Sequence, residues 1–226
     1  MTAVGVSEYV GFEIHEGVAI LELRRPEKRN AMTADMWRAI LSHLDAASGE
    51  PDIRALVVQG VGGVFCAGAD LKAVKDSDGS TAMPYRRLAL RGIEAIAAFP
   101  VPTLARVDGP CVGAGCSLAL ACDLRFAHPD AIFVIPAVRH GIAYDDDSIT
   151  RMVALVGPSR AARMLYAAEP VDAQRALSIG LVDECTRDLD AMVSRFLDAV
   201  HLGDPRTIAA TRKTLRAVSS SCGRRS

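Results

Sequence analysis

Two glycine-rich loops carry the groups of this chain that are best suited to chemistry. One reads FCAGADL over residues 65–71, and the other reads GPCVGAGCSLALACD over residues 109–123. An apolar strand runs into the second loop, and an apolar helix follows its glycines. Glycine leaves backbone N–H groups open to a ligand, and N–H groups at a helix N-terminus suit an oxyanion or a phosphate. The pattern therefore predicts a backbone corner that holds an anion.

Neither loop matches a nucleotide-binding motif. The first has the glycine spacing of a P-loop, but Ala69-Asp70 stands where that motif requires lysine followed by serine or threonine. In the second, Leu118 replaces the third glycine of a dinucleotide-binding fingerprint. One glycine-rich loop is often only a tight turn, whereas two in succession are a more specific signal.

Cysteine and histidine do not form a metal-binding pattern. The six cysteines include no CxxC pair, and the five histidines lack ligand spacing. Cys111, Cys116 and Cys122 surround the second loop, but packing of small apolar residues at a strand–helix corner explains them more simply. We expect no metal ion, and reduced thiols as in a cytoplasmic protein.

Composition argues against several classes of function. The chain has 226 residues, of which 50% are hydrophobic, enough for one domain with a sizeable core. Its 26 Lys and Arg against 27 Asp and Glu give a net charge of −1, so nothing indicates binding to nucleic acid or to an anionic membrane. No apolar run approaches the roughly 20 residues of a membrane span, and the first residues do not resemble a signal peptide. We therefore expect a cytoplasmic location.

Strands and helices have to position the two loops. Residues 10–25 alternate between apolar and polar side chains, which predicts a β-hairpin with its turn at Glu16-Gly17. Thr33 is a good N-cap for a helix over residues 34–48. Further strands are expected at 53–59, 102–107, 124–127 and 131–135, and helices at 85–99, 149–156, 159–168, 172–179, 189–202 and 205–218. This alternation predicts an α/β core with the helices packed outside.

Several motifs together resemble the crotonase (enoyl-CoA hydratase/isomerase) superfamily over about residues 8–215. They are the two loops, RRPEKRNAM at 24–32, the segment 136–151, and the Ala-x-x-x-Gly-Leu-Val-Asp run that ends at Asp183. The resemblance implies a crotonase-type ββα spiral core, which we assign to residues 1–195. It also implies a shortened helical C-terminal region at 196–226 that takes part in trimerisation and ends in a disordered tail. Members of this superfamily form homotrimers or hexamers.

The resemblance also implies an acyl-CoA ligand, with no cofactor beyond its coenzyme A. The thioester oxygen would accept hydrogen bonds from the backbone N–H groups of Ala69 and Ala114. Paired donors of this kind stabilise an enolate oxyanion, and losing one donor costs about 3–4 kcal/mol. The coenzyme A portion would lie near residues of the RRPEKRNAM segment and of the first loop: Lys28, Arg29, Ala31, Ala67, Gly68, Asp70 and Leu71.

Two positions depart from the pattern of the family's hydratases. Those enzymes position and activate water with two glutamates, and here Ser117 and Ala137 stand at the matching positions. Neither side chain acts by itself as a general base near neutral pH. Ordinary enoyl-CoA hydration is therefore not expected. The same absence weakens an isomerase mechanism that relies on a glutamate at position 137.

Asp145 is the remaining candidate for a functional carboxylate. It matches the position of a functional aspartate in dienoyl-CoA isomerases and in an aryl-CoA dehalogenase of the superfamily. Apolar surroundings would raise its pKa and make it a base or a nucleophile. The alternative is that the run Asp145-Asp146-Asp147 caps the helix expected near Ile149, which accounts best for Asp147. Both interpretations stay open for Asp145.

These observations predict an acyl-CoA-binding protein of fatty acid or lipid metabolism that stabilises a thioester oxyanion without ordinary hydratase activity. One alternative is an acyl-CoA isomerase, hydrolase or dehalogenase-like enzyme that uses Asp145. Another is a non-catalytic fatty acyl-CoA shuttle, because a branch of the superfamily that lacks both glutamates has a similar stretch around residues 109–125. Whether the chain is an enzyme stays open.

Overall fold

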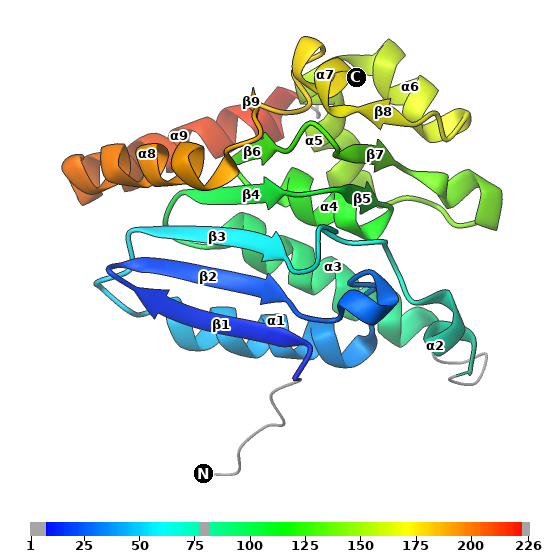
Figure 1. The fold of residues 1–226 in the computed structure, drawn as a ribbon, viewed down its shortest axis with the longest axis horizontal. Helices are drawn as coiled ribbons and strands as arrows, with labels where there is room; N and C mark the ends of the chain where they lie inside the picture. Colours follow the sequence, from blue (N-terminus) through cyan, green and yellow to red (C-terminus); the bar gives the residue numbers. More distant parts are fainter. Residues whose placement is uncertain (1–7, 77–81, 223–226) are drawn as a thin grey trace.

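The structure is a computed structural model that describes residues 8–76 and 82–222 (Figure 1). Its main sheet has six strands in the order β1-β2-β3-β4-β6-β9, and only β1 and β2 run antiparallel. The strands are β1 Val10–His15, β2 Val18–Leu23, β3 Ala55–Gly60, β4 Thr103–Val107, β6 Leu124–Ala127 and β9 Glu184–Cys185. A smaller sheet joins β5 Pro110–Val112, β7 Ile132–Val134 and β8 Val171–Asp172. The predicted α/β class and the N-terminal hairpin are confirmed.

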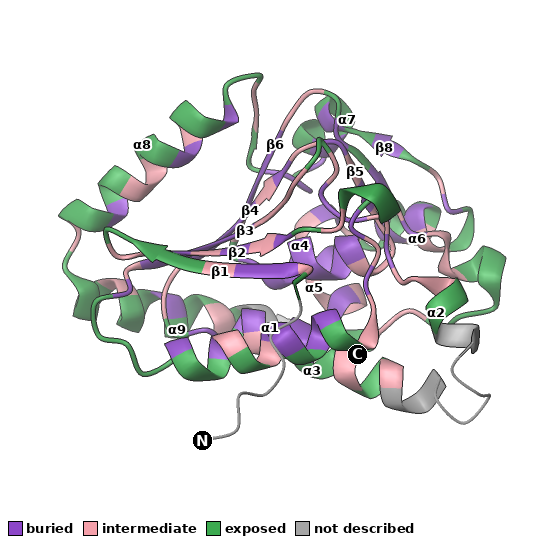
Figure 2. Ribbon diagram, turned by 60° about the horizontal axis from the view of Figure 1, so that its bottom comes forward, coloured by how far each residue is buried: buried purple, intermediate pink, exposed green. Residues whose placement is uncertain are grey.

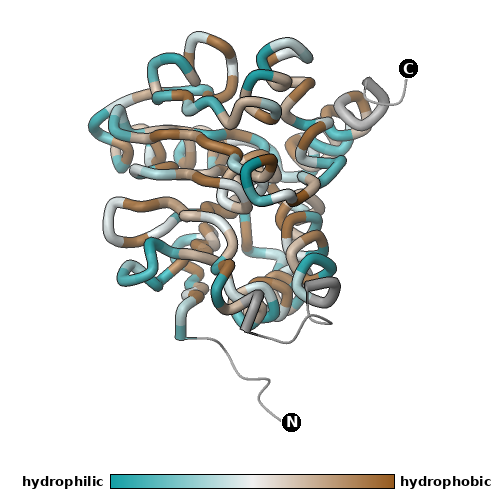
Figure 3. The backbone as a smooth tube through the Cα atoms, turned by 90° about the vertical axis from the view of Figure 1, so that its right-hand side faces the viewer, coloured by the Kyte–Doolittle hydropathy of each residue, from teal (hydrophilic) through white to brown (hydrophobic). Residues whose placement is uncertain are grey.

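Helices cover both faces of the main sheet (Figure 2). In that view α1, α3 and α9 lie on one side of the sheet and α8 lies on the other. The helices and 3-10 turns are η1 Pro26–Lys28, α1 Ala34–Ala47, α2 Leu71–Asp76, α3 Ala82–Ala98, α4 Ala114–Ala121, η2 Pro136–His140, α5 Asp146–Val156, α6 Pro158–Tyr166, α7 Ala173–Ser178, α8 Leu189–Leu202 and α9 Pro205–Cys222. Along the tube in Figure 3, hydrophobic and hydrophilic residues alternate in the outer helices, as expected for helices with one buried face.

The strand period of two divides the buried side chains between the two faces. Leu56 and Val58 of β3 belong to the large core under α1 and α3. Val57, between them in the sequence, belongs instead to a smaller cluster with Leu189 and Val193 of α8. Successive side chains of a strand point to opposite faces, so β3 is apolar on both sides.

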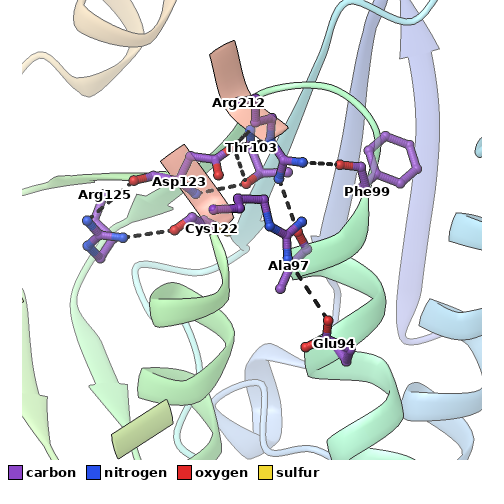
Figure 4. A network of polar contacts seen from close by, with 9 residues as sticks. Glu94, Ala97, Phe99, Thr103, Cys122, Asp123, Arg125 and Arg212 are labelled. Atoms are coloured by element: carbon purple, nitrogen blue, oxygen red, sulfur yellow. Dashed lines mark hydrogen bonds and ion pairs between the residues drawn. The ribbon is translucent and has the colours of Figure 1, made fainter. Parts of the chain in front are cut away.

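Helix α9 is fastened to the core by one buried arginine (Figure 4). Arg212 donates from Nε to the Asp123 carboxylate at 2.6 Å and from its other nitrogens to the carbonyls of Ala97 and Phe99. The same carboxylate oxygen accepts from the backbone N–H and hydroxyl of Thr103. The contact ties α9 to the ends of α3 and α4 and to the start of β4.

The C-terminal elements differ from the sequence expectation in two places. The expected boundary between core and C-terminal region, after residue 195, falls inside helix α8. The division into these two regions stays a prediction. Helix α9 continues to Cys222, past the expected end at Val218. The expected disordered tail beyond Cys222 lies outside the described residues.

Across residues 8–76 and 82–222, no helix is both long and apolar enough to cross a membrane.

Candidate functional site

The two glycine-rich loops lie side by side in parallel register. Cys66 forms a β-bridge with Cys111, and the N–H of Val112 donates to the Cys66 carbonyl at 2.8 Å. Continuing this register along both chains pairs position 68 with 113 and position 69 with 114. The sequence predicted two loops of the same kind, and the structure brings them together.

Glycine is required where the loops approach each other. Gly68 has φ +97°, and a side chain there would place its Cβ 3.0 Å from the Val112 carbonyl oxygen. A Cβ on Gly115 would lie 2.5 Å from the Cys66 carbonyl oxygen. Gly113 has φ +52°, and its Cβ position lies 3.9 Å from the Gly68 Cα. Side chains at Gly68 and Gly115 would therefore push the two loops apart, whereas at Gly113 the positive φ is what favours glycine.

Ala69 and Ala114 present backbone N–H groups at this junction. Met32 bonds to the residues on either side of Ala69, because its N–H donates to the Gly68 carbonyl and its carbonyl accepts from Asp70. The Ala69 N–H is therefore directed away from Met32. Ala114 is the first residue of α4, so its N–H has no acceptor within the helix. Among the hydrogen bonds of the described residues, neither N–H has a protein acceptor.

The segment RRPEKRNAM packs against the first loop and against the residues that follow β3. Asn30 is fully buried, accepts from the Arg25 N–H at 2.8 Å, and donates to the carbonyls of Val61 and Val64. These bonds hold the segment against the end of β3. Lys28 and Arg29 remain exposed, and the Arg29 carbonyl accepts from the Ala67 N–H of the first loop at 2.9 Å.

Asp70 is engaged with the protein itself. Its carboxylate accepts from the Ala73 N–H at 3.1 Å and from Arg25 Nη1 at 2.8 Å. The hydrogen bond from Ala73 and then the Arg25 guanidinium hold the pKa of Asp70 below its ordinary value. Of the predicted coenzyme A residues, the structure joins Arg29 to Ala67 directly and Ala31 to Asp70 through Arg25, and it gives Asp70 a supporting role in the loop.

Asp145 combines the two interpretations that the sequence left open. It is the N-cap of α5, since its Oδ1 accepts from the Ser148 N–H at 2.7 Å. Its Oδ2 turns to the Ser117 hydroxyl at 3.0 Å. Helix α5 begins at Asp146, so Asp147, which was expected among the capping aspartates, lies in the first turn near the positive end of the helix dipole. The capping aspartate is the one that also reaches the second loop.

Sequence analysis missed Tyr144. Its hydroxyl donates to the Gly113 carbonyl at 3.0 Å and lies 2.7 Å from the Ser117 hydroxyl. Burial raises the pKa of Tyr144 well above its ordinary value, so the phenol stays protonated at neutral pH. Only its position next to Asp145 could have drawn attention to it, because no spacing rule predicts the path of the loop that precedes α5.

The two departures from the hydratase pattern meet at the same place. Ser117 is 1% exposed and lies on the first turn of α4, beneath the junction of the loops. Pro136 lies near the second loop, since a Cβ added at Gly113 would be 4.0 Å from its Cδ, and Ala137 follows it in η2. Neither Ser117 nor Ala137 supplies a carboxylate at this junction.

The cysteines beneath the loops are buried thiols. Burial raises the pKa of Cys66 to about 12 and raises that of Cys111 as well. Protonated thiols are poor nucleophiles and poor metal ligands. Within the described ranges, no group of three or more His, Cys, Asp or Glu residues is placed to hold a metal ion.

Comparisons with known proteins agree with this arrangement. A family model described as Enoyl-CoA hydratase/isomerase matches residues 13–220. A protein from Mycobacterium leprae named "probable enoyl-CoA hydratase" is 38% identical over 185 residues, which are 80% of this chain and 73% of that protein. A protein of the same description from Mycobacterium tuberculosis is 34% identical over 213 residues, covering 92% of this chain and 81% of its own.

Solved structures show the same fold. An enoyl-CoA hydratase/isomerase from Xanthobacter autotrophicus Py2 superimposes with a TM-score of 0.88 at 31% identity, covering 96% of this chain and 82% of that one. An enoyl-CoA hydratase from Bacillus anthracis reaches a TM-score of 0.89 over 92% of this chain and 83% of that one, at 22% identity. The second likeness concerns the fold alone.

Proposed function

Because this chain belongs to the enoyl-CoA hydratase/isomerase family, we propose that it binds an acyl-CoA thioester without ordinary hydratase activity. The thioester oxygen lies between the N–H groups of Ala69 and Ala114. The observation that carries the proposal is the pair of backbone donors without protein acceptors, in loops held side by side. Ser117 and Ala137 stand where hydratases carry their two glutamates, which is why ordinary hydration of enoyl-CoA is not part of the proposal.

The chemistry of the donors suits a thioester. A carbonyl oxygen, and still more an enolate oxygen, gains from two preorganised N–H donors in a site that excludes water. Ala114 adds the positive end of the α4 dipole, because it is the first residue of that helix. Small side chains at both positions leave the amides accessible to the ligand.

The coenzyme A portion would extend along the RRPEKRNAM segment. Lys28 and Arg29 are exposed cations beside the first loop and suit the phosphate groups of the ligand. Ala31 and Ala67 are half-buried and leave room for the rest of the nucleotide. A ligand of this class places the protein in fatty acid or other lipid metabolism. We also propose that the chain assembles as a homotrimer or hexamer, for which native mass spectrometry gives the mass.

The two positions that carry the hydratase glutamates lack a base for water activation. Ser117 is buried and shares its one hydroxyl hydrogen between Tyr144 and Asp145. Ala137 offers no titratable group. A hydratase must hold and deprotonate water at the β-carbon, and neither position supplies the group for it.

Calorimetry and a hydration assay test the proposal together. Acyl-CoA should bind to the protein, and crotonyl-CoA should not be hydrated even at high protein concentration. Free coenzyme A is the matched control ligand, because it lacks the thioester carbonyl. Turnover near that of ordinary hydratases would refute the assignment of Ser117 and Ala137, and absence of acyl-CoA binding would refute the proposal as a whole.

A second candidate function rests on the position of Asp145. Its Oδ1 caps the helix, and its Oδ2 accepts from the Ser117 hydroxyl, so one carboxylate oxygen faces the second loop. An acyl-CoA isomerase, hydrolase or dehalogenase-like enzyme would use this carboxylate as base or nucleophile. Asp145→Asn would then abolish turnover of some acyl-CoA while binding survives. If the protein is instead a non-catalytic fatty acyl-CoA shuttle, long-chain acyl-CoA should bind tightly, and neither the wild type nor Asp145→Asn should show turnover.

A further inference from the structure

Tyr144 reaches the carbonyl oxygen that stands behind one of the two proposed donors. Its hydroxyl donates to the Gly113 carbonyl, which also accepts from the Ser117 N–H at 3.2 Å. The Gly113 carbonyl and the Ala114 N–H belong to one peptide unit. A hydrogen bond accepted at the oxygen of a peptide polarises the unit and strengthens its N–H as a donor.

We propose that Tyr144 is a positioning residue that strengthens the Ala114 N–H as a donor to the thioester oxygen. This inference rests on the proposed acyl-CoA function, because the donor has a role only if a carbonyl group is bound there. It assigns Tyr144 a part in the site that the hydratase pattern does not contain.

A chain of polar contacts holds the tyrosine hydroxyl in place. Tyr144 donates to the Gly113 carbonyl, and its oxygen lies 2.7 Å from the Ser117 hydroxyl, whose one hydrogen is shared between Tyr144 and Asp145. Ser117 lies 3.0 Å from Asp145, which α5 holds in turn through the Ser148 N–H. The residue that replaced the hydratase glutamate thus helps to orient the phenol.

The other proposed donor is backed in the same manner by the main chain. The Gly68 carbonyl, in the peptide unit of the Ala69 N–H, accepts from the Met32 N–H at 2.7 Å. Both donor peptides therefore carry a hydrogen bond at their carbonyl oxygens. The Cys66 thiol adds only a weak, long contact to the Gly68 carbonyl, at 4.0 Å. On the Ala114 side a tyrosine hydroxyl supplies the bond at 3.0 Å, and substitution can remove it.

Infrared spectroscopy of a bound thioester measures the effect directly. The probe is hexanoyl-CoA that carries carbon-13 at its carbonyl, a saturated ligand that cannot be hydrated. Binding to the wild-type protein should lower the carbonyl stretching frequency. Tyr144→Phe should reduce that shift by about 10–30%, the cooperative strengthening expected of one hydrogen bond. Tyr85→Phe is the matched control, since it removes a half-buried hydroxyl that donates to the Met32 carbonyl, outside both donor peptides.

A second variant separates polarisation from a structural role. Incorporation of 3-fluorotyrosine at position 144 keeps the shape of the side chain and makes the phenol a stronger donor, so the shift should increase. A merely structural tyrosine would leave the shift unchanged in this variant, which would overturn the inference even if Tyr144→Phe binds poorly. A wild-type protein that binds hexanoyl-CoA without any carbonyl shift would refute the proposed function instead.

Discussion

At the scale of single residues, Ala114 contributes to the proposed site through its backbone alone. Exchange of its methyl group for another side chain leaves the N–H in place, so only proline removes the donor. Proline is tolerated at the first position of a helix, where the N–H has no intrahelical acceptor and the fixed φ suits the helix. Ala114 occupies that position in α4.

Ala114→Pro is expected to weaken acyl-CoA binding by roughly three- to tenfold, the usual contribution of one hydrogen bond. Any turnover should fall further, by about 10²–10³, because a donor to an oxyanion counts most in the transition state. Calorimetry and turnover assays measure the two effects. Ala34→Pro is the control, because Ala34 is the first residue of α1 after its N-cap Thr33. Equal losses of acyl-CoA affinity in Ala114→Pro and Ala34→Pro would contradict the role of the Ala114 N–H as a donor.

Asp70 provides a prediction about acid stability. Its pKa in the folded protein lies below the ordinary value of 3.8, because of the hydrogen bond from Ala73 and the charge of Arg25. A depressed folded pKa adds stability that is fully present above the unfolded value and disappears as the pH falls through the folded one. The difference in unfolding free energy between wild type and Asp70→Asn should therefore be constant above about pH 5 and shrink below about pH 4.

Urea denaturation of both proteins across this pH range checks the expectation. Asp35→Asn controls for the loss of one negative charge, since the Asp35 side chain is 77% exposed on α1. A difference for Asp70→Asn that grows as the pH falls would contradict the assignment of Asp70 as a paired carboxylate in the native loop.

At the scale of elements, α9 depends on a polar anchor. Arg212 is 8% exposed and satisfies three acceptors on two segments, Ala97 and Phe99 at the end of α3 and Asp123 after α4. A buried arginine that bonds main-chain carbonyls at helix ends replaces the water that those carbonyls would otherwise need. The last helix is thus coupled to the C-terminal ends of α3 and α4.

Arg212→Met is expected to lower the free energy of unfolding by about 2–4 kcal/mol, because buried carbonyls and part of a carboxylate lose their donor. Thr103 still donates to Asp123, which keeps the cost below that of a fully orphaned charge. Lys213→Met removes a neighbouring exposed cation from the same helix and should change stability by less than about 0.5 kcal/mol. Chemical denaturation measures both free energies of unfolding. Equal values for the two variants would show that Arg212 contributes little to stability.

The sequence predicted the elements well where a single periodicity or glycine pattern decided the structure. Alternation gave the hairpin of β1 and β2, and the glycines marked both loops that carry Ala69 and Ala114. The start of α5 was placed near Ile149 instead of Asp146, because three successive aspartates offered three possible caps and the sequence does not show which one accepts from the first turn. The contacts of Tyr144 could not be predicted, since they depend on the path of η2 and the loop after it.

At the scale of the whole molecule, the main sheet separates two apolar regions of different size. The large core contains buried side chains of α1, α3 and α4, and both donor loops lie against it. The smaller cluster lies under α8, where Leu189 and Val193 meet Val57, Leu104 and Phe126. Few buried side chains hold α8, each worth about 1.5–3 kcal/mol.

Native-state hydrogen exchange should therefore show α8 opening at a lower free energy than β3, whose Leu56 and Val58 face the large core. Because the donor loops belong to the large core, hexanoyl-CoA should slow exchange in residues 66–70 and 112–117 and leave α8 unchanged. Exchange measured by mass spectrometry with and without ligand, at increasing urea, gives both results. If α8 gained protection together with the loops, the two regions would unfold as one unit, and ligand binding would stabilise the protein through global folding instead of locally.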